Sequence, residues 1–147
     1  MKINKDIILI SGGFDPIHSG HISLIKHASE FGDIVILLNS DNWLREKKGK
    51  EFLSFEERKI IMSSLKKVID VIPFNDSDKT CKDGISKAIK KYPKSKIKFA
   101  NGGDRNNNST PEIDFCEKNN VEMLWGIGGD FKMNSSSWIL QKWNEDK

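Results

Sequence analysis

The stretch IILISGGFDPIHSGH, residues 7–21, decides the fold because it joins a strand pattern to a helix pattern through a glycine-rich turn. Its first residues, Ile7 to Ile10, form an uninterrupted apolar run, which is typical of a strand buried on both faces of a parallel sheet. Apolar residues then recur at helical spacing from Gly20 to Phe31, and Gly32 is predicted to end that helix. The segment therefore predicts a strand, a turn and a helix in immediate succession.

The same alternation continues along the rest of the sequence. Further strands are predicted by apolar runs at 34–38, 68–74, 97–100 and 121–127. Helices are predicted from the Ser54 capping box to about Leu65, around 85–89, from Thr110 and Pro111, and from about Ser135, whereas the lysine-rich segment 41–52 is predicted to be irregular. Strands that alternate with helices imply crossover connections and a parallel sheet. We therefore predict an α/β fold, a Rossmann-like doubly wound parallel five-stranded sheet with helices on both faces.

Length and composition indicate an ordinary soluble domain. The chain has 147 residues, which predicts a single domain over 1–147, and it is 37% hydrophobic and 31% charged. No apolar run approaches the ~20 residues of a membrane span, and the charged start, Met1 to Asp6, lacks the apolar core of a secretory signal. We therefore expect a cytoplasmic location and no membrane partner.

The cysteines and the charge exclude further classes. Cys81 and Cys116 are the only cysteines and have no CxxC spacing, so we expect two free thiols rather than a disulfide framework or a thiolate zinc site. The net charge of +3 comes from scattered lysines and indicates no nucleic-acid partner.

The turn between the first strand and the first helix carries the candidate chemistry. Two of the three histidines in the chain, His18 and His21, lie in it at a spacing that lets both project to one side of the helix start. Glycines allow close backbone approach, and a helix start attracts phosphate. Two imidazoles there could stabilise charge on a leaving pyrophosphate. The residues alone also allow a tight turn with two surface histidines.

GGFDPIHSGH, residues 12–21, matches the GxFDxxHxGH signature, with its HxGH motif, of the cytidylyltransferase-like nucleotidyltransferase family. The chain resembles two branches of that family, the glycerol-3-phosphate cytidylyltransferases and the heptose-type sugar-phosphate adenylyltransferase domains. The resemblance extends from Ile7 to about Ile139 with the motifs in the family's order. It implies transfer of a nucleoside monophosphate, CMP being favoured, from an NTP to a phosphorylated polyol or sugar, with release of pyrophosphate.

The resemblance also implies roles for particular residues. His18, His21 and Lys47 would be catalytic, with Lys50 as a second lysine candidate for the nucleotide; without the resemblance these lysines would belong to a solvated loop. The remaining nucleotide-binding residues would be Gly13, Phe14, Asp15, Gly20, Arg58, Gly103, Asp104, Ser135, Ser136 and Ser137.

Several of these residues could have a structural role instead of a role in nucleotide binding. Arg58 is equally compatible with a surface ion pair, the Gly103 loop with an ordinary turn, and the serines with a helix N-cap. Asp15 is expected to shape the phosphate and acceptor pocket rather than to bind metal or act as a base. The family often carries an arginine about five residues before the serines, whereas this chain has Asp130 there and only Lys132 nearby.

The implied mechanism is in-line displacement by an acceptor phosphate that is already anionic, so no residue need be a nucleophile. Mg²⁺ is expected as the counterion of CTP or ATP, held mainly by phosphates and water, with no protein metal ligands. A homodimer is implied by resemblance alone.

Two other classes of function remain open. HSGH, and KMNSS at residues 132–136, also resemble the signature pair of class I aminoacyl-tRNA synthetases, although those enzymes need further domains to hold tRNA. A non-catalytic nucleotide-binding module would fit the missing arginine, but it has less need of paired histidines.

Overall fold

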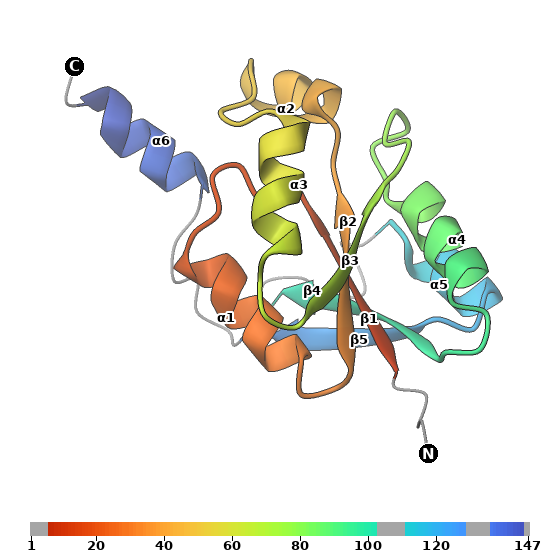
Figure 1. Cartoon of the computed structure of the whole chain (residues 1–147). Coiled ribbons are helices and arrows are strands. Elements are labelled where there is room, and N and C mark those ends of the chain that lie inside the picture. The colour runs from red at the N-terminus through yellow and green to blue at the C-terminus, as the bar shows by residue number, and fades with distance from the viewer. Residues whose placement is uncertain (1–5, 103–110, 129–135, 146–147) are drawn as a thin grey trace.

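The computed structural model describes residues 6–102, 111–128 and 136–145, and a parallel sheet of five strands forms their centre (Figure 1). The strands lie in the order β3-β2-β1-β4-β5, and every neighbouring pair is parallel. Their bounds are β1 Ile7–Gly12, β2 Asp33–Leu38, β3 Val68–Pro73, β4 Ile97–Gly102 and β5 Glu122–Ile127. The helices are α1 Ser19–Ala28, α2 Asp41–Lys48, α3 Phe55–Ser63, α4 Lys82–Lys91, α5 Ile113–Lys118 and α6 Ser136–Glu145. The predicted doubly wound, Rossmann-like sheet is confirmed.

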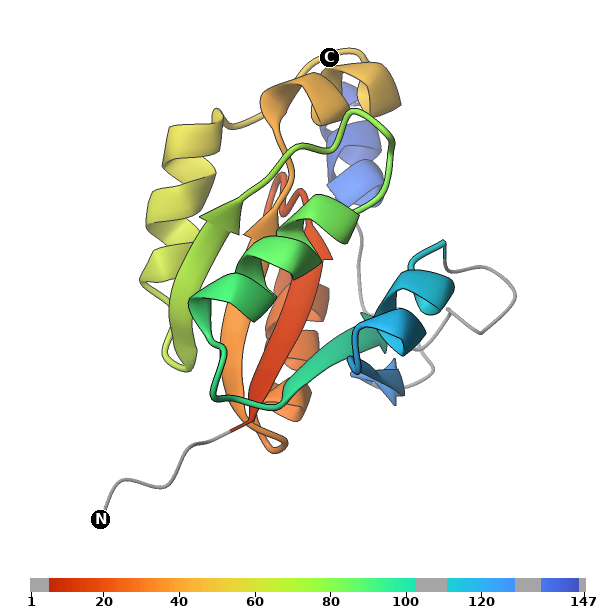
Figure 2. The same cartoon turned by 90° about the vertical axis from the view of Figure 1, so that its right-hand side faces the viewer.

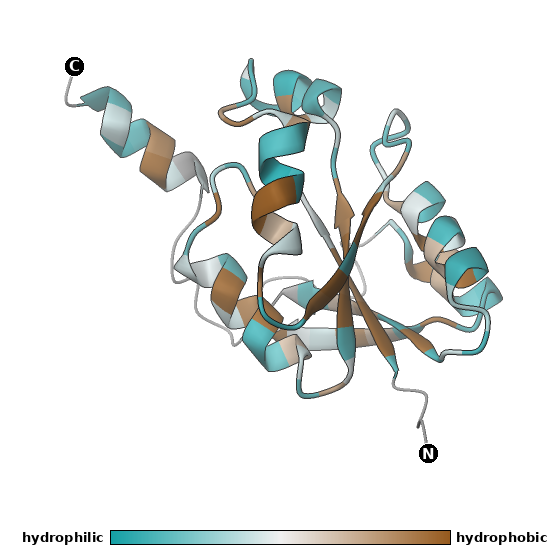
Figure 3. Ribbon diagram, in the orientation of Figure 1, coloured by the Kyte–Doolittle hydropathy of each residue, from teal (hydrophilic) through white to brown (hydrophobic). Residues whose placement is uncertain are grey.

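Helices cover both faces of the sheet because alternate residues of each strand point to opposite sides. Ile7 and Leu9 of β1 pack with α4 and α5, whereas Ile8 and Ile10 pack with α1 and α3. Figure 2 shows α4 and α5 together on one face, and Figure 3 shows the apolar strands between the more polar outer surfaces of the helices. This two-sided burial explains why the strand sequences are continuous apolar runs.

The prediction that segment 41–52 is irregular is wrong over most of its length, because Asp41–Lys48 forms α2. The Ser40 hydroxyl caps this helix by accepting from the main-chain N–H of Trp43 at 3.1 Å, and Gly49, with φ of 93°, follows its last turn. Leu44 is the only buried residue in the helix, so the sequence carried no apolar stripe to reveal it.

Other element ends also differ from the predictions. The helix predicted from Thr110 and Pro111 begins instead at Ile113, with Glu112 as its N-cap, and Thr110 lies outside the described residues. The first helix ends at Ala28 rather than near Phe31. Gly32, in the turn after this helix, lies close to the main chain of Asp6. A Cβ on Gly32 would lie 2.2 Å from the main-chain oxygen of Asp6, so there is no room for a side chain.

The predictions about the cysteines and about membrane-spanning segments can also be compared with the structure. Cys81 and Cys116 are both free and buried, as predicted. Within the described ranges, no helix combines the length and the apolar character needed to cross a membrane.

Candidate nucleotide site

A pocket of about 510 Å³ lies at the carboxyl end of the sheet, where ligands of doubly wound folds bind. This volume is in the range of small-molecule sites. Its walls come from the turn after β1, from α2, from the loop between β3 and α4, from the residues before α5 and from Ser136. The sheet therefore gathers segments that are far apart in the sequence around one opening.

The two histidines of the HxGH motif cap their own helix. Nδ1 of His18 accepts from the main-chain N–H of Gly20 at 3.0 Å, and Nδ1 of His21 accepts from the main-chain N–H of His18 at 3.2 Å. A ring nitrogen that accepts from an N–H carries no proton, so the proton of each neutral ring is on Nε2. Each ring therefore has its donor on the atom away from the backbone.

The surroundings of His21 hold its ring in the neutral form. His21 lines the pocket and its ring stacks on that of His18, with centroids 3.8 Å apart. Burial, followed by the nearby His18, lowers the pKa of His21 to about 3. Phe14 adds an edge contact, with ring centroids 4.8 Å apart. His21 is therefore a neutral hydrogen-bond donor near pH 7, not a cation.

The glycine-rich turn folds tightly against α2. A Cβ on Gly13 would lie 2.8 Å from Cδ2 of Leu44, so the turn approaches the helix more closely than a side chain would allow. Phe14 adopts the left-handed conformation, with φ of 51°, and its ring is buried, although part of the residue lines the pocket. Gly13 and Phe14 thus both lie at the predicted site.

The carboxylate of Asp15 joins this turn to the segment between α2 and α3. Its two oxygens accept from the main-chain N–H groups of Phe52 and Leu53, each at 2.6 Å. Lys48 completes the contact, with Nζ 3.1 Å from Oδ2 and a further hydrogen bond to the main-chain oxygen of Asp15. These contacts make Asp15, which also lines the pocket, a brace that shapes one wall.

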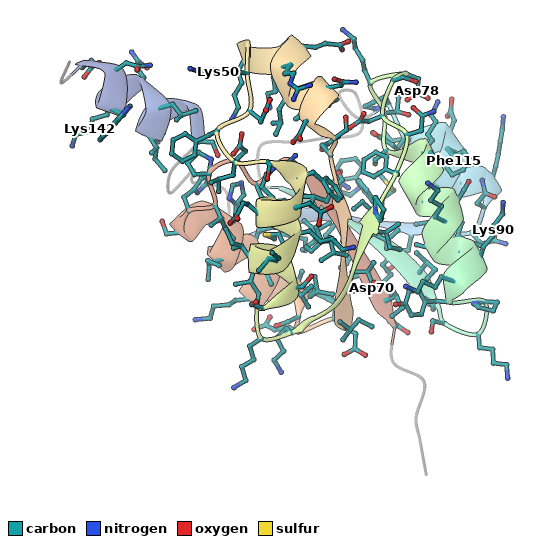
Figure 4. The ribbon with its side chains drawn as sticks, turned by 45° about the horizontal axis from the view of Figure 1, so that its top comes forward. Lys50, Asp70, Asp78, Lys90, Phe115 and Lys142 are labelled. Atoms are coloured by element: carbon teal, nitrogen blue, oxygen red, sulfur yellow. The ribbon has the colours of Figure 1, made fainter. Side chains whose placement is uncertain are left out.

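The structure separates the candidate lysines. Lys47 and Lys48 both line the pocket, and Nζ of Lys47 lies 4.7 Å from the ring centroid of Trp43, a residue to which sequence reasoning assigned no role. Lys50 lies outside this pocket, beside a second groove that Phe52 and Trp143 also line (Figure 4). The geometry therefore brings Lys47 to the site and leaves Lys50 outside it.

Arg58 has a position that neither sequence interpretation anticipated. Its side chain is fully buried, so the surface ion pair is wrong. Its guanidinium donates to the main-chain oxygens of Leu53, Gly13 and Asn39 at 3.0, 3.0 and 2.8 Å, and to Oδ1 of Asp41 at 2.6 Å. Arg58 supports the loops from behind and does not line the pocket.

The serine motif reaches the site through Ser136. Its hydroxyl donates to the main-chain oxygen of Pro16 at 2.7 Å, so α6 begins beside the HxGH turn and then extends away from the sheet (Figure 1). Ser137 follows in the first turn of α6. Gly103, Asp104 and Ser135 lie outside the described residues, as do Asp130 and Lys132.

Sequence reasoning missed the residues that close the other side of the pocket. Lys79, Thr80 and Cys81 follow β3, and Glu112 precedes α5. Burial, followed by the charge of Glu112, raises the pKa of the Cys81 thiol, so the thiol stays protonated. Their position after a buried strand was the available signal, because loops at the carboxyl ends of neighbouring strands converge. Within the described part of the chain, no group of three His, Cys, Asp or Glu side chains could hold a metal ion.

Solved structures share this fold at low sequence identity. A lipopolysaccharide core biosynthesis protein from Thermoplasma volcanium superposes with a TM-score of 0.62 at 21% identity, over 82% of this chain and 94% of that one. A protein from Vibrio parahaemolyticus gives a TM-score of 0.62 at 18% identity, over 97% of this chain and 89% of that one.

Two of the sequence relatives each match about half of the chain. It is 36% identical over 67 residues to the glycerol-3-phosphate cytidylyltransferase of Bacillus subtilis, covering 45% of this chain and 52% of the relative. It is 38% identical over 73 residues to the bifunctional protein HldE of Blochmanniella pennsylvanica, covering 48% of this chain and 15% of that protein. The chain thus spans about half the length of the first relative and a small share of the second.

A family model reaches much further than these pairwise matches. The model described as cytidylyltransferase-like matches residues 9–144, which include the HxGH turn, both pocket-lining lysines of α2 and the start of α6. The chain therefore belongs to the cytidylyltransferase-like family.

Proposed function

We propose that this protein transfers a nucleoside monophosphate from an NTP to a phosphorylated polyol or sugar and releases pyrophosphate. The observation that carries the proposal is the pair of stacked histidines, His18 and His21, whose Nδ1 atoms accept from main-chain N–H groups, with His21 lining a pocket that lysines also line. A site that only binds anions could use lysines alone. Donors fixed by the backbone suit a transition state in which charge grows on phosphoryl oxygens.

The chain's own residues position and neutralise the reacting phosphates. The acceptor phosphate is anionic near neutral pH, so its oxygen attacks the α-phosphorus as the bond to pyrophosphate breaks, without a protein base. Nε2 of His21 and of His18 donates to the triphosphate, and Lys47 supplies a mobile positive charge. Ser136 places the start of α6 against the same turn.

Mg²⁺ is part of the proposal as the companion of the nucleotide. The carboxylate of Asp15 already accepts two main-chain N–H groups and pairs with Lys48, so it does not suit a metal ligand. An ion that keeps its waters and binds the phosphates needs few protein oxygens, and it would neutralise the pyrophosphate. No role of a protein residue depends on it here.

CTP is the proposed donor, because the glycerol-3-phosphate cytidylyltransferase of Bacillus subtilis is 36% identical over the 67 residues that match. The alternative is ATP with a sugar phosphate as acceptor, which the GGFD and GGD motifs of the sequence favour. A homodimer is also part of the proposal, and sedimentation velocity tests it directly.

Pyrophosphate release tests the reaction. The purified protein is incubated with Mg²⁺, each NTP in turn and a panel of phosphorylated polyols and sugars. We expect acceptor-dependent release with one NTP, and a loss on the order of 10²- to 10³-fold in kcat for His18→Ala. His27→Ala is the matched control, since His27 lies on the same helix and its Nδ1 accepts from Gly128, outside the pocket. If the protein binds NTP but releases no pyrophosphate with any acceptor, the result would instead indicate a non-catalytic nucleotide-binding module.

A further inference from the structure

The carboxylate of Glu112 is a buried charged group that the proposed chemistry does not use. The residue is 4% exposed and lines the pocket. Its Oε2 accepts from the thiol of Cys81 at 3.5 Å, whereas its Oε1 has no hydrogen-bond partner among the residues that the structure describes. A buried carboxylate is unfavourable unless its oxygens are paired. The pocket therefore has an acceptor position that an incoming donor can satisfy.

The sign of the charge restricts which part of a ligand lies there. The lysines of the same pocket, Lys47, Lys48 and Lys79, attract phosphate, but the Glu112 carboxylate repels it. No ion pair among the described residues involves Glu112. The part of a ligand that lies against Glu112 is therefore a neutral group that donates hydrogen bonds, while the ligand's phosphate lies near the lysines.

The position of Glu112 in the fold separates it from the residues assigned to the triphosphate. His18 and His21 belong to the layer of α1 and α3, and Ser136 contacts the same turn. Glu112 occupies the N-cap position of α5, and its partner Cys81 occupies that of α4, so both belong to the opposite layer. Because the proposed contacts to the triphosphate lie in the first layer, this side of the pocket is open to the acceptor.

We infer that Glu112 selects the acceptor by accepting a hydrogen bond from one of its hydroxyl groups. This inference rests on the proposed transfer to a phosphorylated polyol or sugar and adds that the acceptor's hydroxyl-bearing carbon chain lies against Glu112 and Cys81. Its phosphate then extends toward the lysines and histidines of the pocket.

The experiment compares acceptors that carry different hydrogen-bond donors: hydroxyl groups, none, or an ammonium group. Glycerol 3-phosphate, propyl phosphate and ethanolamine phosphate are tested with wild type, Glu112→Gln and Glu112→Ala. Wild type is expected to prefer glycerol 3-phosphate over propyl phosphate by on the order of 10- to 100-fold in kcat/KM. Both variants should reduce that ratio while the KM for NTP stays unchanged.

Glu117→Gln is the matched control, because it makes the same change on the exposed side of the same helix. Melting temperatures of all variants separate a loss of recognition from a loss of folding. An unchanged acceptor ratio in folded Glu112→Gln and Glu112→Ala overturns the inference. So does a change in the preference between CTP and ATP alone, which would place Glu112 at the base. A wild-type preference for ethanolamine phosphate that Glu112→Gln abolishes overturns the hydroxyl assignment in favour of an ammonium group.

Failure of the proposed function gives a different result. Absence of pyrophosphate release with every acceptor in wild type contradicts the transferase. Calorimetric binding of glycerol 3-phosphate against propyl phosphate, in wild type and Glu112→Gln, then still tests the inference. Stronger binding of glycerol 3-phosphate that the variant loses supports it, and equal binding overturns it.

Discussion

The main-chain N–H of His18 donates to Nδ1 of His21 at 3.2 Å, so the second histidine of the motif caps the first. Nδ1 of His18 in turn accepts from the main-chain N–H of Gly20 at 3.0 Å. This reciprocal arrangement is the geometry of a capping box, with imidazoles in place of hydroxyl and carboxylate. The motif therefore begins α1 and fixes the tautomer of its own histidines with the same hydrogen bonds.

The first prediction concerns the dependence of stability on pH. His21 has a pKa of about 3 in the folded protein, well below the 6.5 of an unperturbed histidine. Between these values the unfolded chain binds a proton at this residue and the folded chain does not, so stability is lost as the pH falls. We expect His21→Asn to reduce the slope of unfolding free energy against pH by about 1.4 kcal/mol per pH unit between pH 6 and 4.

Urea unfolding at a series of pH values measures this slope. Lys26→Gln, at an exposed position of the same helix, is the control and should leave the slope unchanged. Equal slopes for wild type and His21→Asn would show that His21 is protonated in the folded state.

The second prediction separates the two lysines that the sequence nominated. Lys47 lines the pocket, whereas Lys50 lies beside the second groove. Loss of a charged contact to phosphate weakens binding by on the order of 10- to 100-fold, so we expect Lys47→Ala to raise the KM for NTP by that factor. Lys50→Ala serves as the matched control and should leave the KM close to the wild-type value. Similar increases for both variants would contradict the observed separation.

The fold was predictable because its signals are local and repeated. Ile7 to Ile10 and the apolar runs at 34–38 and 97–100 are long enough to identify strands that are buried on both faces. α2 was missed because its single buried residue, Leu44, gives no periodicity, and its stability depends on the Ser40 cap and on tertiary contacts.

The candidate site was predictable only where its residues adjoin one another in the sequence. The HxGH turn is contiguous, so His18 and His21 could be named from their spacing. Arg58 and Glu112 act through partners 5 to 45 residues away, and only the folded chain shows that one is a buried support and the other lines the pocket. Their burial, not their identity, decides what they do.

The third prediction concerns the brace at Asp15. Its buried carboxylate accepts from the N–H groups of Phe52 and Leu53 and pairs with Lys48. Asp15→Asn places an amide NH₂ where one acceptor stood and removes the negative charge that pairs with Lys48, so we expect a loss of about 3 kcal/mol in unfolding free energy. Chemical denaturation measures the change. Asp114→Asn, on the exposed side of α5, is the control, and a loss no larger than the control's would mean that Asp15 is not a structural brace.

The fourth prediction uses the two arginines that the structure describes, which differ strongly in burial. Arg58 is 1% exposed and its guanidinium donates four hydrogen bonds, three to different loops and one to the first residue of α2, whereas Arg45 pairs with Glu51 on the surface. A lysine ammonium cannot reproduce the planar fork of a guanidinium. We therefore expect Arg58→Lys to lower the unfolding free energy by about 2 kcal/mol, and Arg45→Lys to change it much less.

The same variants decide whether Arg58 contacts the nucleotide. The guanidinium of Arg58 donates to the main-chain oxygens of Gly13 and Asn39 and does not line the pocket. We therefore expect Arg58→Lys to lower the melting temperature while the KM for NTP stays close to the wild-type value. Thermal melting and NTP titration of the same preparations give both quantities. A large rise in KM for Arg58→Lys with an unchanged melting temperature would place the guanidinium on the phosphates. A fall in melting temperature with an unchanged KM at low temperature would identify Arg58 as the support that holds the pocket's walls in position.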